Sequence, residues 1–256
     1  MKKIIIYRKG KYWIAKCLET SEEVKKKTKK KTIEKSKELI KGRKKIIEIP
    51  DCTKFEKGIE KYKNREKRDS MYKIASYLIR EFWYNPVEIT DGLGILLLTW
   101  NQGFYRYGLF DFNELEKFLK NKQEQIESFR KREICSFKEG DKNKIEELFE
   151  TLLKSLQIAS GKNKKRKSPV AVAKALHLLA PNFFPLWDST IAKEYGCYYR
   201  GKNSKKAAEK YVEFCKIQHI LAKLLKKCII RKDKTLLKLI DEYNYVRYTK
   251  KWIRDC

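Results

Sequence analysis

Apolar and polar residues alternate along the first part of the chain and predict a small α/β module. Residues 3–18 have the period of two that is typical of β-strands, interrupted by the polar segment 8–11, which predicts a hairpin turn. A helical spacing over 33–40 and an apolar strand over 45–49 follow. We therefore expect residues 1–51 to form a β-β-α-β module.

From residue 53 onward the apolar residues recur at helical spacing, so residues 53–256 are expected to form one all-helical domain. The helix that ends at Trp100 is apolar nearly all round, which predicts a central position. The fold class is therefore mainly α. In chain order, the expected helices are one over 71–82 ended by Asn85-Pro86, one capped by Thr90 or Asp91 and ending at Trp100, one capped by Asp111, one over 145–156, one from Ser168-Pro169 to Ala180, one beginning at Asp188 or Ser189, and two over about 205–228 and 233–249.

The composition indicates a folded protein rather than a disordered or membrane-spanning one. Of 256 residues, 42% are hydrophobic and 12% aromatic, which is enough for a packed core although 37% are charged. The longest apolar run, Gly92–Trp100, is shorter than the roughly 20 residues that cross a bilayer. Because the basic N-terminus lacks the apolar stretch and cleavage site of a signal peptide, we expect no membrane segment and a cytoplasmic location.

The charge balance favours a polyanionic partner. Lys and Arg number 62 against 33 Asp and Glu, which leaves a formal net charge of +29. Five cations also fall within the six residues 162–167. An excess of this size repels itself unless it faces a polyanion, so nucleic acid is the expected partner.

The cysteines predict neither a metal site nor a disulfide framework. There are seven, at 17, 52, 135, 197, 215, 228 and 256, with no C-x-x-C pair and no histidine at zinc-ligand spacing. We expect reduced thiols, mostly in the core, and no cofactor.

Residues 167–192 are the most informative stretch for function. Three of the five prolines, Pro169, Pro181 and Pro185, fall here, and a single acid, Asp188, stands where a cap of the next helix is expected. A basic segment leads into this stretch. The pattern predicts a carboxylate held on a rigid loop beside a basic entry point.

This arrangement resembles the helix-hairpin-helix DNA glycosylase superfamily, in which a Pro-containing loop carries a catalytic Asp at a helix cap. The family loop commonly reads Pro-Val-Asp-Thr-His-Val, and the segment 185–191 keeps the Pro, the Asp, a following hydroxyl residue and an aliphatic residue, with one residue inserted. Arg166-Lys167-Ser168 is similar to the segment that carries the lysine of strand-cutting members. Ile95–Gln102 is similar to the family's buried helix with a polar, aromatic tip. The resemblance covers roughly residues 70–200.

The chain departs from this family in two places. The Leu-Pro-Gly-x-Gly hairpin that holds a phosphate is absent, and Gly161 is the only glycine near its position. Phosphate anchoring would then fall to the lysines. The four cysteines that bind an iron–sulfur cluster in some members are also missing.

The resemblance implies a mechanism that the residue types can support. Breaking an N-glycosidic bond builds positive charge on the sugar, which the Asp188 carboxylate would stabilise. Lys167 would be the nucleophile that attacks C1′ and forms a Schiff base, and it must be neutral to do so. Reaching a base in a duplex requires that the base be flipped out. The candidate base pocket comprises Trp100, Phe104, Tyr105, Phe184 and Trp187; Asn101, Gln102 and Arg106 would fill the gap in the duplex; and Lys162, Lys164, Lys165 and Arg166 would contact phosphates.

Each candidate also has a purely structural interpretation. Asp188 can be an ordinary N-cap, and Lys167 a solvated phosphate contact. Lys174, on the helix after Lys167, is a weaker candidate nucleophile. His177 is expected to be a hydrogen-bonded core residue, and Phe184 and Trp187 can be loop anchors.

Three functions follow from these observations. The first is a base-excision DNA glycosylase, with or without lyase activity, that acts on double-stranded DNA carrying a damaged or mismatched base. The second is a non-catalytic nucleic-acid-binding protein with a basic helical surface. The third is a regulatory assembly in which the N-terminal module binds a partner protein. The lesion, the choice between DNA and RNA and the oligomeric state stay open.

Overall fold

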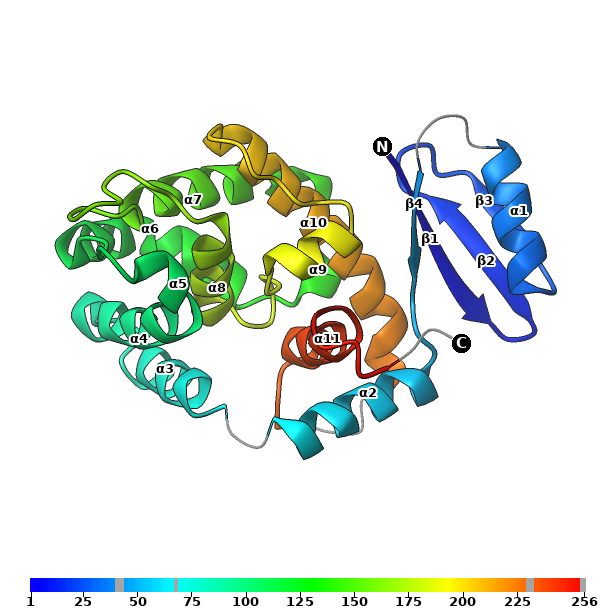
Figure 1. Cartoon of the computed structure of the whole chain (residues 1–256), viewed down its shortest axis with the longest axis horizontal. Helices are drawn as coiled ribbons and strands as arrows, with labels where there is room; N and C mark the ends of the chain where they lie inside the picture. Colours follow the sequence, from blue (N-terminus) through cyan, green and yellow to red (C-terminus); the bar gives the residue numbers. More distant parts are fainter. Residues whose placement is uncertain (40–43, 67–68, 229–232, 254–256) are drawn as a thin grey trace.

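The computed structural model describes residues 1–39, 44–66, 69–228 and 233–253. A small four-stranded sheet with one helix forms the N-terminal part, and helices make up the rest (Figure 1). The expectation of a mainly helical protein with a small N-terminal sheet is confirmed. Within the described ranges, no helix is both long enough and apolar enough to cross a membrane.

The sheet has one strand more than the sequence pattern predicted. Its order is β3-β2-β1-β4, in which β1 is antiparallel to β2 and parallel to β4. The unpredicted strand is β3, which lies at the edge of the sheet. It buries only one side chain, that of Val24, so its sequence shows no alternation of apolar and polar residues. The module is therefore β-β-β-α-β. Its elements are β1 (Lys2–Lys9), β2 (Tyr12–Cys17), β3 (Glu23–Lys26), α1 (Lys29–Leu39) and β4 (Lys44–Glu48).

The two faces of this sheet bury different cores. Ile4 and Ile6 point toward α1, whereas Ile5 and Ile47 join the core of the helical domain, as strand alternation requires. The sheet accordingly lies between α1 and α10 (Figure 1). The buried Lys3 reinforces this contact through an ion pair with Glu213 of α10.

The helical domain begins immediately after the sheet and surrounds the central helices α4 and α8. Both are mostly buried and apolar, which explains their position. The helices are α2 (Cys52–Arg65), α3 (Ser70–Glu81), α4 (Pro86–Trp100), α5 (Gln102–Tyr105), α6 (Phe112–Arg130), α7 (Lys142–Ser155), α8 (Pro169–Leu179), α9 (Ser189–Glu194), α10 (Ser204–Leu225) and α11 (Leu236–Asn244), with short 3-10 turns at Ile134–Ser136, Glu139–Asp141 and Lys226–Cys228 and a π turn at Tyr245–Thr249.

Most predicted helix starts are confirmed by side-chain caps. Asp111, Ser168 and Asp188 each accept a hydrogen bond from a backbone amide in the first turn of the next helix. The start of α4 was predicted wrongly. Asn85 caps it and Pro86 is its first residue, so this pair begins a helix rather than ending one.

The helix predicted over 71–82 buries only part of its apolar face. Ala75 and Ile79 are buried against α4, but Met71, Ile74 and Phe82 are exposed. The helix lies at the edge of the domain and packs closely along one side only, so its wide apolar stripe is only partly covered.

The cysteines also differ from expectation. Cys52 and Cys228 form a disulfide between the start of α2 and the turn after α10. Since 176 residues separate them in the chain, no spacing rule could have paired them. Cys17, Cys135, Cys197 and Cys215 are free, and Cys256 lies outside the described residues.

Candidate functional site

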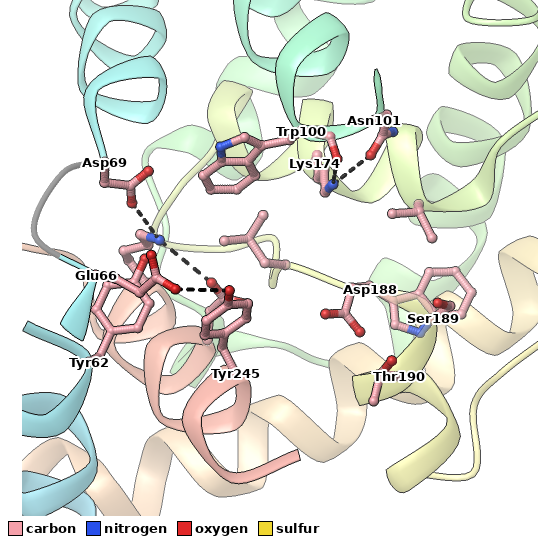
Figure 2. Close-up of a pocket in the computed structure, with 15 residues that line it drawn as sticks. Tyr62, Glu66, Asp69, Trp100, Asn101, Lys174, Asp188, Ser189, Thr190 and Tyr245 are labelled. Carbon is pink, nitrogen blue, oxygen red and sulfur yellow. Dashed lines mark hydrogen bonds and ion pairs between the residues drawn. The ribbon is translucent and has the colours of Figure 1, made fainter. Parts of the chain in front are cut away.

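A cavity of about 520 Å³ opens where five segments of the helical domain meet. Tyr62 of α2, Trp100 of α4, Lys174 of α8, Asp188 before α9 and Asp241 of α11 line different sides of it. We call this the central pocket. In Figure 2, Lys174 and Asp188 project into it from opposite sides.

Lys174 is held at the end of α4 by two hydrogen bonds. Its ammonium donates to the Trp100 carbonyl at 3.0 Å and to Asn101 Oδ1 at 2.5 Å. Burial lowers the pKa of Lys174 to about 8, while Asp188 and Asp241 oppose that shift. A substantial fraction of this amine is therefore neutral near physiological pH, which nucleophilic attack requires.

Asp188 combines a structural role with a position in the pocket. Its Oδ1 accepts a hydrogen bond of 2.6 Å from the Ile191 amide, so it is the N-cap of α9, as expected. Its Oδ2 accepts from the Thr249 hydroxyl at 3.4 Å. The carboxylate is half-buried and lines the central pocket beside Ser189 and Thr190 (Figure 2).

The loop before Asp188 is held by buried side chains. The Tyr211 hydroxyl donates to the Pro185 carbonyl at 3.0 Å, and His177 Nδ1 lies 2.8 Å from the Phe184 carbonyl. These bonds confirm His177 as a core residue. Burial lowers its pKa to about 3, so His177 is neutral and its Nδ1–H donates. These two bonds attach the loop before Asp188 to α8 and α10.

A buried lysine forms the opposite wall. Lys238 is 2% exposed and pairs with Asp69 at 3.0 Å, Asp241 at 3.6 Å and Glu242 at 3.7 Å. Burial lowers its pKa, but the three carboxylates raise it more, so Lys238 stays protonated. Burial raises the pKa of Asp241 to about 7 against the effect of Lys238. Lys238 is therefore a charged residue of the pocket wall. Of the two lysines that line the pocket, Lys174 is the one whose pKa is lowered.

The structure places the predicted nucleophile outside this pocket. Lys167 is exposed, and its ammonium lies 3.4 Å from the Ser204 hydroxyl. It precedes the N-cap Ser168 and therefore the helix itself, whereas Lys174 lies two turns further on, where α8 faces Asp188. Lys174, and not Lys167, therefore lines the central pocket with Asp188. Lys174 is the weaker of the two candidates from the sequence, and the signal that distinguishes it is that it is the only Lys or Arg in the apolar helix α8.

The residues at the C-terminal end of α4 and just after it lie partly in the central pocket and partly on the surface. Trp100 lines the pocket and stacks on Tyr72 with a centroid separation of 5.8 Å. Asn101 is buried and positions Lys174, so it is not available to fill a gap in a duplex. Gln102 and Arg106 are exposed, as that role would need.

Three of the five predicted stacking residues lie elsewhere. Tyr105 is buried and donates to the Leu156 carbonyl at 3.0 Å, and Phe184 is fully buried beside Phe129. Neither lines the central pocket, so Tyr105 and Phe184 are core residues and not part of a base pocket there. Phe104 is half-buried beside a second cavity. Of the five predicted stacking residues, only Trp100 and Trp187 line the central pocket.

Two residues that line the central pocket each carry a buried donor without a hydrogen-bond partner in the described part of the chain. Asn101 Nδ2 and Trp187 Nε1 have no hydrogen-bond partner among the residues that the structure describes. Buried donors are rarely left unpaired in folded proteins. They would suit acceptor atoms of a bound molecule.

The predicted phosphate-binding segment forms a hairpin between α7 and α8. Ile158 accepts from the Lys165 amide at 2.8 Å and donates to the Arg166 carbonyl at 2.9 Å. Gly161 turns the chain with φ +79°, and a Cβ there would lie 2.3 Å from the Tyr107 carbonyl oxygen. Glycine is required at this turn for both reasons.

This hairpin borders a second cavity of about 790 Å³, which we call the basic groove. Its first wall is residues 164–169 and its second wall is residues 198–204. Of the predicted phosphate contacts, Lys164, Lys165 and Arg166 line it, while Lys162 is exposed on the turn of the hairpin. Val170, Trp187 and Ser189 line both cavities, so the groove adjoins the central pocket.

Comparison of the chain with protein-family models, with curated proteins and with solved structures finds no match. The central pocket and the basic groove are therefore the features from which a function can be inferred.

Proposed function

We propose that this protein is a DNA N-glycosylase with lyase chemistry, in which Lys174 is the nucleophile and Asp188 the stabilising carboxylate. One observation carries the proposal. A lysine whose pKa is lowered to about 8 and a fixed carboxylate line the same pocket, next to an aromatic wall and a basic groove.

The residues have complementary roles in the proposed reaction. A base enters the central pocket and stacks near Trp100. The neutral Lys174 amine forms a bond to C1′ while the bond from C1′ to the base breaks, and the base leaves with the electron pair. One amine proton ends on the departing base. The bond between C1′ and the ring oxygen then breaks, the ring oxygen takes the second amine proton, and a neutral Schiff base between Nζ and C1′ remains. The Asp188 carboxylate stabilises the positive charge that develops on the sugar.

Borohydride trapping tests this proposal, because reduction of the Schiff base makes the adduct permanent. Duplexes carrying 8-oxoguanine, uracil, thymine mismatches, alkylated bases or an abasic site would be offered to the wild type and to Lys174→Gln. The expected result is an adduct with at least one substrate that Lys174→Gln does not form. Lys120→Gln, at an exposed lysine of α6 outside both cavities, is the matched control and should keep the adduct.

Other outcomes would separate the alternatives. Alkali-labile sites without an adduct would mean that water replaces Lys174 as the nucleophile. Salt-dependent DNA binding with neither product would support the non-catalytic binding protein, in which Asp188 serves only as an N-cap. That second function has its own support, since the basic groove would bind a polyanion whether or not a reaction follows.

A further inference from the structure

The basic groove differs from the other cavities in its charge. Six of its lining residues are cations and none is acidic: Lys164, Lys165, Arg166, Lys167, Arg200 and Lys202. The central pocket, in contrast, contains Glu66, Asp69, Asp188 and Asp241.

The second wall was not identified from the sequence. Arg200 and Lys202 are both exposed there, and neither forms an ion pair with any residue in the described ranges. The Asn203 side chain caps α10 by accepting from the Lys206 amide at 3.0 Å. Lys167 reaches across to Ser204 and connects the two walls. The groove is therefore bordered by cations on both sides.

Aromatic rings also line the groove beside these cations. Phe104, Tyr198 and Tyr199 are half-buried and line the groove. The Arg166 guanidinium lies 5.8 Å from the centre of the Phe104 ring. Tyr199 also accepts a hydrogen bond from the Asn203 amide at 3.3 Å, which fixes its position on the second wall. Cations that follow a backbone beside rings that stack bases are typical of single-strand binding sites.

We propose that the basic groove binds unpaired nucleotides of the DNA strand whose reacting base occupies the central pocket. This inference rests on the proposed function for the identity of the reacting nucleotide, but binding in the groove does not depend on the reaction. Arg200 and Lys202 contact phosphates, and Tyr199 stacks against a base. Because Trp187 and Ser189 border both cavities, the bound nucleotides are direct neighbours of the reacting one.

Fluorescence anisotropy with a labelled, unmodified single strand and with the matching duplex tests this assignment between about 50 and 200 mM salt. The wild type is expected to bind the single strand more tightly. Loss of two phosphate contacts in Arg200→Ala/Lys202→Ala should reduce the slope of log affinity against log salt by about 1.4, at about 0.7 per contact. Lys120→Ala/Lys131→Ala, exposed on and just after α6, removes the same charge and should leave the slope unchanged.

Tyr199 provides a second readout that does not involve charge. Tyr199→Ala should weaken single-strand binding about fivefold or more, while Tyr199→Phe, which keeps the ring and loses only the hydroxyl that accepts from Asn203, should weaken it less. A wild-type salt slope in Arg200→Ala/Lys202→Ala, or equal losses in the groove variant and the α6 control, would overturn the assignment. Single-strand binding is measured on unmodified DNA without any reaction, so failure of the proposed reaction and failure of the groove are distinguishable.

Discussion

Lys174 Nζ lies 2.5 Å from Asn101 Oδ1, and this contact joins the middle of α8 to the end of α4. A neutral amide accepts the hydrogen bond, so the contact orients the amine without adding a negative charge. Because burial lowers the pKa of Lys174 to about 8, the contact holds in place an amine that loses its proton easily.

The proposed reaction should therefore accelerate as Lys174 loses its proton. Below pH 8 the neutral fraction rises about tenfold per pH unit, and the rate of borohydride trapping should follow it and level off above about pH 8. Single-turnover trapping across this range measures the profile. A rate that stays constant from about pH 6 to about pH 8 would contradict a role for the Lys174 amine.

Changing Asn101 to Asp places a carboxylate against the ammonium. An opposite charge at this distance raises a lysine pKa by about 1–3 units, so the trapping profile of Asn101→Asp should move to higher pH by that amount. Gln102→Glu adds the same charge one residue later on the exposed surface and is the control. Equal profiles for the two variants would show that Asn101 does not act through Lys174.

The two roles of Asp188 can be separated by two substitutions. Asn is as good an N-cap as Asp, so Asp188→Asn should keep the stability of the fold, whereas Asp188→Ala should lose about 1 kcal/mol of unfolding free energy. Both should lose base release by about 10²–10³-fold if the carboxylate stabilises the transition state. Denaturant unfolding and single-turnover assays measure the two effects. Full activity in Asp188→Asn would show that Asp188 acts only as the N-cap of α9.

His177 should make the fold sensitive to acid. Its pKa is about 3 in the folded protein and about 6.5 when unfolded, so the unfolded state binds the extra proton and stability falls as the pH drops below about 6.5. The fall approaches about 1.4 kcal/mol per pH unit until about pH 3.

His177→Leu should remove that pH dependence. It should also cost about 2–5 kcal/mol at neutral pH, since the Phe184 carbonyl and the Tyr72 hydroxyl lose their partner. Urea unfolding at several pH values compares the variant with the wild type. An unchanged slope of stability against pH in the variant would assign the acid sensitivity to other groups.

The disulfide should contribute to stability only when oxidised. Cys52→Ser/Cys228→Ser should lower the unfolding free energy by about 2–5 kcal/mol relative to the oxidised wild type. Reductant should bring the wild type to the level of the variant. Cys135→Ser, which replaces a free and half-buried thiol, should change little. If reductant has no effect on the wild type, the pair does not stabilise the fold.

Local sequence patterns determined the elements of this protein. The alternation around Ile4 and Ile6 predicted the first strands, and side-chain chemistry at Asp111, Ser168 and Asp188 predicted where helices begin, because caps act within one turn. The strand at 23–26 escaped prediction because an edge strand buries few side chains.

The tertiary structure alone decided which residues share a cavity. Lys167 and Lys174 are both basic and seven residues apart, but only Lys174 faces Asp188, because it lies within α8 rather than before its cap. The same holds for the pairing of Cys52 with Cys228 and for the second wall of the basic groove. Contacts between distant segments depend on how helices pack, and a pattern confined to a few turns of one helix does not contain that information.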